Sequence, residues 1–308
     1  MRAPMISHPN GASTSSVAPD DVHAATRPTT VRQAASRQAA WLPPALIGAL
    51  LGLALSAYFL LPLRTTVLLL GIDRAPAGTD VSRSDTMILM TFLPARPYVG
   101  MLSIPRDLWV TIPGMGPNRI NTAHFFAEAS RTGTGPAAAE RAVQANLGVR
   151  VHGSVRIRFD AVRTLVDALG GVEVDLPVAE SGYSAGPHRL NGSQALAFVR
   201  DRMGSDDFFR MGRGQLFLRS MGMRMLDPRA WPGLIAALPR LAGSIDTDVP
   251  AWEWPRLALT LARVGWGGID AHVLARDMVT PTTTSGGAQV LMPDWGRINP
   301  LLFEIFGQ

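Results

Sequence analysis

The distribution of apolar residues divides the chain into three regions. Residues 1–38 show no apolar periodicity and are rich in Ala, Ser, Thr and Pro, a composition typical of disordered tails. Residues 39–63 are almost wholly apolar and uncharged, and a stretch of that length can span a bilayer. Residues 64–308 alternate short apolar runs with amphipathic stretches. We therefore predict a tail, a transmembrane segment and one folded domain.

The flanking charges predict how the apolar segment is oriented. Arg27, Arg32 and Arg37 precede it, and positive flanks favour the cytoplasmic side of a membrane. A cleaved signal peptide has a shorter apolar core, which favours an uncleaved signal anchor. We predict a single-pass protein of the bacterial plasma membrane, with a cytoplasmic amino terminus and the folded domain of residues 64–308 outside.

The periodicity within residues 64–308 predicts strands that alternate with helices. Short continuous apolar runs are typical of strands buried on both faces, whereas apolar residues three and four apart indicate helices. The Pro-, Thr- and Gly-containing run 280–287 is predicted to be a loop. The fold class is α/β, a single mixed-sheet domain flanked by helices. Predicted strands cover residues 67–72, 86–93, 98–104, 108–112, 154–159, 172–176 and 269–274, and predicted helices cover 137–147, 160–169, 190–199, 210–226, 234–241 and 257–264.

Composition excludes some classes of function. The chain has no Cys, so disulfides, thiolate metal sites and Cys nucleophiles are excluded. Its 29 basic residues are all Arg, so the presence of Arg at any one position says little about its role. The net charge of +5 is modest and no basic run with interleaved aromatics occurs, so no nucleic-acid partner is expected.

Arg and Asp recur together in short segments at the ends of predicted elements. An exposed Arg–Asp pair taken alone contributes little. Gathered by a fold, the guanidinium groups would match phosphate oxygens and the carboxylates would suit a magnesium ion. If the first two predicted strands are antiparallel neighbours, Asp73 and Asp85 come together. The segments are Asp73-Arg74, Arg83-Ser84-Asp85, Arg106-Asp107, Arg200-Asp201-Arg202 and Asp207-Phe208-Phe209-Arg210.

A series of motifs occurs in one order along the chain. Over roughly residues 66 to 305 the chain resembles the LytR-CpsA-Psr family of cell-envelope glycopolymer phosphotransferases, and the order of the motifs makes the resemblance specific. The motifs are Leu69-Leu70-Gly71-Ile72-Asp73, Arg83-Ser84-Asp85-Thr86, Ser103-Ile104-Pro105-Arg106-Asp107, Arg119-Ile120-Asn121, residues 166–174, residues 190–202 and Asp207-Phe208-Phe209-Arg210.

The resemblance implies an activity and roles for the matching residues. The implied reaction is magnesium-dependent transfer of a glycopolymer phosphate from a polyisoprenyl-pyrophosphate carrier to a peptidoglycan sugar hydroxyl. Asp73 and Asp85 resemble the metal-associated carboxylates, and Asp85 or Asp207 would accept the hydroxyl proton. The catalytic candidates are Arg83, Asp85, Arg106 and Asp207, and the pyrophosphate-binding candidates are Arg83, Arg106, Arg119, Arg200, Arg202, Arg210 and Gln215.

Other readings remain open from the residues alone. A hydrolase that cleaves polyprenyl pyrophosphates with water, or a non-catalytic module that binds them, would need the same Arg and Asp residues. Gly214 stands where the family typically has Gln; either Gln215 substitutes for it or that contact is lost, which keeps the non-catalytic reading open. A lone His such as His124 is expected to be an ordinary hydrogen-bonding residue. An apolar groove for the lipid would draw on Val166, Leu169, Leu196, Phe198 or Leu218, although such spacing is more often plain core.

Overall fold

A computed structural model describes residues 42–73, 79–201 and 207–307. By its internal contacts the chain divides into two compact units, residues 1–54 and 55–308. The predicted tail of residues 1–38, as well as Arg74 and Arg202, lies outside the described residues.

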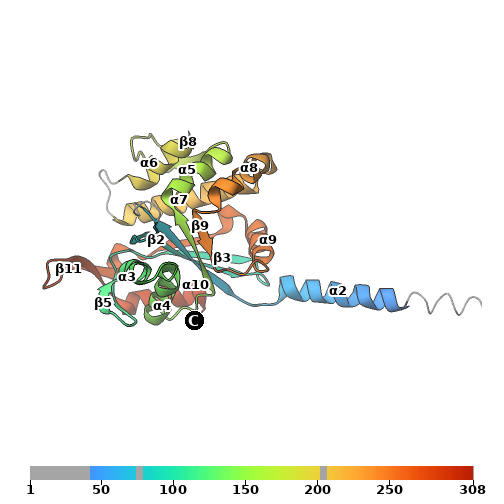
Figure 1. The fold of residues 1–308 in the computed structure, drawn as a ribbon, viewed down its shortest axis with the longest axis horizontal. Coiled ribbons are helices and arrows are strands. Elements are labelled where there is room, and N and C mark those ends of the chain that lie inside the picture. Colours follow the sequence, from blue (N-terminus) through green and yellow to red (C-terminus); the bar gives the residue numbers. More distant parts are fainter. Residues whose placement is uncertain (1–41, 74–78, 202–206, 308) are drawn as a thin grey trace, which may run out of the picture. The chain divides into compact units, whose positions relative to one another are not determined.

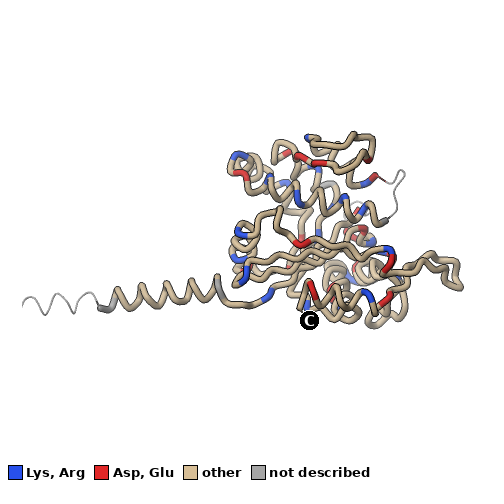
Figure 2. Tube along the Cα trace, turned by 180° about the vertical axis from the view of Figure 1, so that it is seen from behind, with Lys and Arg blue, Asp and Glu red and all other residues tan. Residues whose placement is uncertain are grey.

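Helix α2 (Leu42–Leu60) is the first described element and falls within the predicted membrane segment. None of its 19 residues is charged (Figure 2). Among the described residues, no helix is sufficiently long and apolar to cross a membrane. The signal anchor therefore stays a prediction.

A mixed sheet forms the centre of the folded unit (Figure 1). It has six strands, in the order β10-β3-β2-β1-β6-β9. β2 runs antiparallel to both β1 and β3, whereas β6 is parallel to β1 and β10 is parallel to β3. This confirms the mixed α/β class. The strands are β1 (Thr65–Ile72), β2 (Ser84–Leu93), β3 (Tyr98–Ser103), β6 (Gly153–Arg158), β9 (Ile245–Thr247) and β10 (Asp270–Val273).

Helices cover both faces of this sheet (Figure 1). Successive side chains of a strand point to opposite faces, so Leu68 and Leu70 pack into one buried cluster and Val67 into another. The first cluster includes residues of α4 and α10, and the second includes residues of α9. The helices are α3 (Thr122–Ser130), α4 (Gly135–Leu147), α5 (Phe159–Ala168), α6 (Gly192–Arg200), α7 (Asp207–Leu226), α8 (Trp231–Leu241), α9 (Trp254–Val264) and α10 (Trp295–Phe306).

Three two-stranded sheets lie outside the central one. They account for most departures from the expected elements. The loop expected at residues 280–287 is confirmed only for 284–287, because β11 extends to Thr283 and pairs with β12. Leu190 belongs to a strand and not to the following helix. The pairs are β4 (Trp109–Ile112) with β5 (Gly116–Arg119), β7 (Val172–Leu176) with β8 (Gly186–Leu190), and β11 (Val279–Thr283) with β12 (Gln289–Pro293).

Four strands begin or end at one edge of the central sheet, and the candidate site lies at this edge. β1 ends, β2 begins, and β3 and β6 end there, as the pairings of Ile72 with Ser84 and with Arg158 show. Gly71 pairs with Thr86, and the register shifts between Gly71 and Ile72. Asp85 is thus the extra residue of a β-bulge, a distortion that re-aims side chains next to active sites.

Candidate active site

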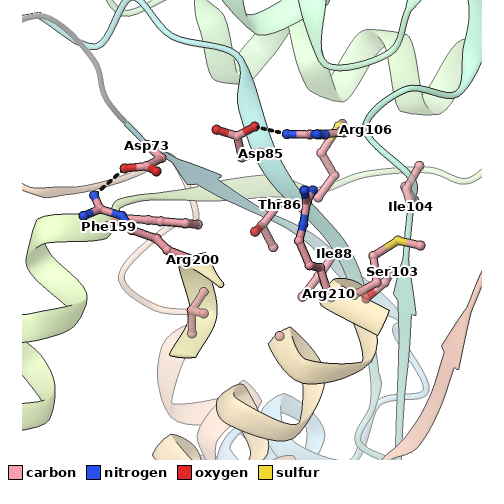
Figure 3. Close-up of a pocket in the computed structure, with 14 residues that line it drawn as sticks. Asp73, Asp85, Thr86, Ile88, Ser103, Ile104, Arg106, Phe159, Arg200 and Arg210 are labelled. Carbon is pink, nitrogen blue, oxygen red and sulfur yellow. Dashed lines mark hydrogen bonds and ion pairs between the residues drawn. The ribbon is translucent and has the colours of Figure 1, made fainter. Parts of the chain in front are cut away.

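A polar pocket lies at this sheet edge, between the strand ends and helices α6 and α7. Asp73 follows β1, Asp85 sits in the bulge of β2, and Arg106 follows β3 (Figure 3). The sequence prediction that Asp73 and Asp85 come together is confirmed, since both line this pocket. Arg200 and Arg210 reach it from the two helices.

Two ion pairs organise the pocket. Nη1 of Arg106 donates to Oδ1 of Asp85 at 2.7 Å, and Arg200 donates to Asp73 (Figure 3). The side chains of Arg106 and Arg200 keep 21% and 35% of their surface exposed, so each can still meet a ligand. Arg210 brings a third guanidinium group to the pocket, and guanidinium groups suit the binding of an anion. Nε of Arg106 also lies 3.5 Å from Asp107.

The end of α6 positions Arg200. Asn191 and Gln194 form a reciprocal capping box at the start of the helix. The helix ends at Arg200, because Asp201 has an extended backbone with φ −58° and ψ 131°. Arg200 then lies 5.9 Å from the ring centre of Phe159, another residue that lines the pocket.

Several predicted ligand residues are placed elsewhere. Arg83 is exposed just before β2 and does not line the pocket. Nε of Arg119 lies 3.3 Å from Asp107, and its Nη2 donates to the carbonyl of Gln289. The buried Gln215 donates to Ser103 Oγ at 2.9 Å and to a backbone carbonyl of β10 at 2.5 Å, so its amide ties α7 to the sheet.

Two further candidates have no described side-chain position. Arg202 lies outside the described residues, and Asp207 begins α7 with a side chain that the structure does not describe. Their roles, and those of Arg83, Arg119 and Gln215 toward a phosphate ligand, stay predictions.

The acidic residues of the pocket fit a magnesium ion that arrives with phosphates. Within residues 42–73, 79–201 and 207–307, no group of three or more His, Asp or Glu could hold a metal by itself. Mg²⁺ is commonly held by one or two carboxylates, with substrate phosphates and water supplying the remaining ligands. Asp73 and Asp85 could supply those carboxylates.

An apolar cavity adjoins the polar pocket. The two share Thr86, Ile88, Phe159, Val199 and Gly214, so they lie side by side between the sheet and α7. Residues that line only the apolar part include Leu69, Val162, Leu165, Phe217, Leu218 and Met221.

Sequence periodicity identified few of the residues that line this cavity. Of the five groove candidates, only Leu218 lines it. Val166, Leu169 and Phe198 are buried in the cluster formed by the helices, as the core interpretation expected. The missed residues come from several separate elements, and only their spacing on α5 and α7 hinted at a shared face.

A second cluster of charges lies beside the site. Arg156 is buried between Asp80 at 2.9 Å, Glu128 at 3.1 Å and Asp246 at 2.5 Å. Its Nη1 is also 3.4 Å from His124, whose Nδ1 lies 2.8 Å from the carbonyl of Ser82. His124 is fully buried, in keeping with the expected structural role, and this burial lowers its pKa.

This cluster holds the connection between β1 and β2. Asp80 and Ser82 belong to that connection, and Ser82 Oγ donates to the backbone carbonyl of Asp73 at 2.7 Å. The buried charges therefore position Asp73 without entering the pocket.

Comparison with known proteins agrees with this architecture. The model of the LytR_cpsA_psr family matches residues 63–294. The chain belongs to this family. The polyisoprenyl-teichoic acid–peptidoglycan teichoic acid transferase TagU of Oceanobacillus iheyensis is 39% identical over 190 residues, which cover 59% of this chain and 58% of the relative. TagU of Enterococcus faecalis is 30% identical over 202 residues, which cover 63% of this chain and 64% of the relative.

Solved structures show the same LytR-CpsA-Psr fold. The crystal structure of Bacillus subtilis TagV superposes with a TM-score of 0.62 at 22% identity, over 80% of this chain and 98% of that one. Each TagU match spans less than two thirds of the relative's own length.

Proposed function

We propose that this protein transfers a glycopolymer phosphate from a polyisoprenyl-pyrophosphate carrier to a sugar hydroxyl of peptidoglycan. The observation that carries the proposal is the two-part site, in which a polar pocket with three Arg residues adjoins an apolar cavity. A lipid pyrophosphate has the same two parts, a polyanion and a hydrocarbon chain. The names of the TagU relatives, which are teichoic acid transferases acting between polyisoprenyl carriers and peptidoglycan, support it.

The Arg residues would bind and orient the pyrophosphate. Arg106 and Arg200 are each held by a carboxylate, so their guanidinium groups are positioned before the ligand arrives. Arg210 adds a third charge from α7. Asp73 and Asp85 would hold a magnesium ion, which would supply additional charge neutralisation on the phosphate oxygens.

The chemistry is a displacement at phosphorus. The oxygen of the acceptor hydroxyl forms a bond to the phosphorus that carries the glycan, and the bond from that phosphorus to the bridging oxygen breaks. Prenyl phosphate leaves with the electron pair of the broken bond. The hydroxyl proton passes to a carboxylate, and Asp85 faces the pocket from the bulge of β2, whereas Asp207 remains the alternative.

The acceptor sugar would approach from the side of the β11–β12 hairpin. A second pocket there is lined by Asp107, Phe208, Thr282 and Gln289, among others. It lies next to the polar pocket, because Asp107 follows Arg106 and Phe208 is two residues from Arg210. Hydroxyl, amide and carboxylate groups beside an aromatic ring suit a sugar.

We further propose that residues 39–63 anchor the protein in the bacterial plasma membrane, with the folded unit outside. The uncharged sequence of α2 and the preceding arginines support this. Protease treatment of intact cells tests it: the folded unit is expected to be cleaved from outside, and its full protection would contradict the topology.

Product analysis tests the reaction. The full chain in lipid nanodiscs is incubated with a pyrophosphate-linked lipid glycan, Mg²⁺ and a peptidoglycan acceptor, and the products are weighed by mass spectrometry. A glycan joined to the acceptor by a phosphodiester is expected. Free phosphate-ended glycan would instead identify a hydrolase, and binding without turnover would identify a non-catalytic module.

A further inference from the structure

Gly214 lies where the polar pocket meets the apolar cavity. It lines both spaces from α7, and Thr86 and Ile88 of β2 also line both. Phe159 and Val199 complete the shared lining, so a ligand with one part in each space would pass alongside Gly214.

Packing within the protein does not require glycine at this position. A Cβ built on Gly214 would meet no heavy atom of its surroundings within 4 Å among the described residues. Gly222 on the same helix differs, because a Cβ there would lie 1.7 Å from the ring of Trp266. Glycine inside a helix destabilises it relative to alanine, so α7 gives up stability at position 214 for open space in the site.

We propose that Gly214 sets the width of the passage between the polar pocket and the apolar cavity, and so determines which isoprenoid pyrophosphates the site accepts. The inference rests on the proposed function, because it takes the apolar cavity to receive the hydrocarbon chain. The first isoprene unit next to the phosphates is the part that must fit past this residue. A side chain at 214 would obstruct that unit and leave phosphate binding by Arg106 and Arg200 unchanged.

Gly212 provides a matched control. It lies in the same helix, a Cβ there also meets no heavy atom within 4 Å among the described residues, and it lines neither space. Residues two apart do not share a helix face. Alanine at either position is expected to stabilise the helix, so any difference in ligand binding reports the passage and not the fold.

The test compares two ligands on the full chain in lipid nanodiscs. Binding of farnesyl pyrophosphate and of inorganic pyrophosphate is measured by calorimetry for the wild type, Gly214→Ala, Gly214→Leu, Gly212→Ala and Gly212→Leu, in the presence of Mg²⁺. Gly214→Leu is expected to weaken farnesyl pyrophosphate binding by about tenfold or more, as overpacking does, with a smaller loss for Gly214→Ala. Inorganic pyrophosphate binding and both Gly212 variants are expected to match the wild type.

The outcomes separate this inference from the proposed function. Farnesyl pyrophosphate binding that survives in Gly214→Leu would overturn the role of Gly214 and leave the proposed function standing. Equal loss of both ligands in that variant would place Gly214 at the phosphates and also overturn the inference. A wild-type protein that binds neither ligand would count against the proposed function itself.

Discussion

Arg156 and Arg106 lie near the same edge of the central sheet, and each contacts Asp residues, but their surroundings differ. Arg156 is 5% exposed and is enclosed by Asp80, Glu128 and Asp246. The side chain of Arg106 is 21% exposed and lines a pocket that contains more guanidinium groups than carboxylates. The first arrangement encloses its cation within the protein, whereas the second leaves part of the guanidinium group accessible to a ligand.

The difference shows that burial and charge balance, and not residue type, separate a structural cluster from a binding site. Removing one member of a buried ion cluster leaves an uncompensated charge, which is costly. Breaking a partly exposed pair costs the fold little. The two clusters should therefore respond to mutation in opposite ways.

The largest expected effect is a loss of stability in Arg156→Ala. Loss of this cation leaves the charge of the buried Glu128 without its counter-charge and should lower the free energy of unfolding by about 3–5 kcal/mol. Urea unfolding followed by circular dichroism measures it. Arg297→Ala is the control, since Arg297 is 58% exposed beside Asp277 and should change stability by less than about 1 kcal/mol. Equal effects of the two variants would remove the distinction between the clusters.

Arg106→Ala should have the opposite effect, with a large loss of ligand affinity and little change in stability. Each hydrogen bond to a charged phosphate contributes about 1.5–3 kcal/mol, so affinity for inorganic pyrophosphate with Mg²⁺ should fall roughly 10- to 150-fold. Stability should change by less than about 1 kcal/mol, because the pair with Asp85 is partly exposed. Calorimetry and urea unfolding on the same sample measure both quantities. Unchanged affinity would remove Arg106 from the site.

Gln215→Ala tests a residue that sequence motifs assign to the pyrophosphate but whose amide faces the sheet. Removing the buried amide should lower the free energy of unfolding by about 1–3 kcal/mol, because Ser103 loses its donor. Affinity for inorganic pyrophosphate should stay near the wild-type value. A large loss of affinity with unchanged stability would restore the ligand role.

The smallest expected effect concerns Glu140, a carboxyl outside both Arg clusters. Burial and the nearby Asp248 raise the pKa of Glu140 to about 7. A carboxyl whose pKa is raised by folding stabilises the protein while protonated, so stability should decline as pH rises from about 4.5 to about 7. The effect is modest because the side chain is only half-buried. Thermal unfolding across this range should show a weaker pH dependence in Glu140→Gln, and an identical dependence would contradict the assignment.

The sequence predicted the strands that carry the site, because their apolar runs are buried on both faces. It also predicted that Asp73 and Asp85 meet, which required only that β1 and β2 be antiparallel neighbours. It could not predict which way a motif residue points. Gln215 follows Gly214 directly, yet one residue of a helix turns the side chain away from the pocket and toward Ser103.

Contacts between segments that are far apart in the chain could not be predicted from the sequence either. Arg156 gathers acidic residues from three different elements, and no local pattern links them. The β11–β12 hairpin escaped prediction because four of the five residues of β11 are exposed and show no apolar alternation. Such strands lack the signal that identified the central sheet.

Because Asp85 lies in the bulge of β2, its side chain is independent of the strand pairing, unlike that of a residue in a regular strand. Gly71 pairs with Thr86 and Ile72 pairs with Ser84, so Asp85 takes no part in the ladder. Exchange of its side chain leaves every cross-strand partner and the inward–outward parity of the strand unchanged. Gly71 has no such freedom, because a Cβ placed on it would lie 2.9 Å from the Cβ of Thr86. The residue at position 85 can thus be substituted without any change in the strand pairing of the sheet.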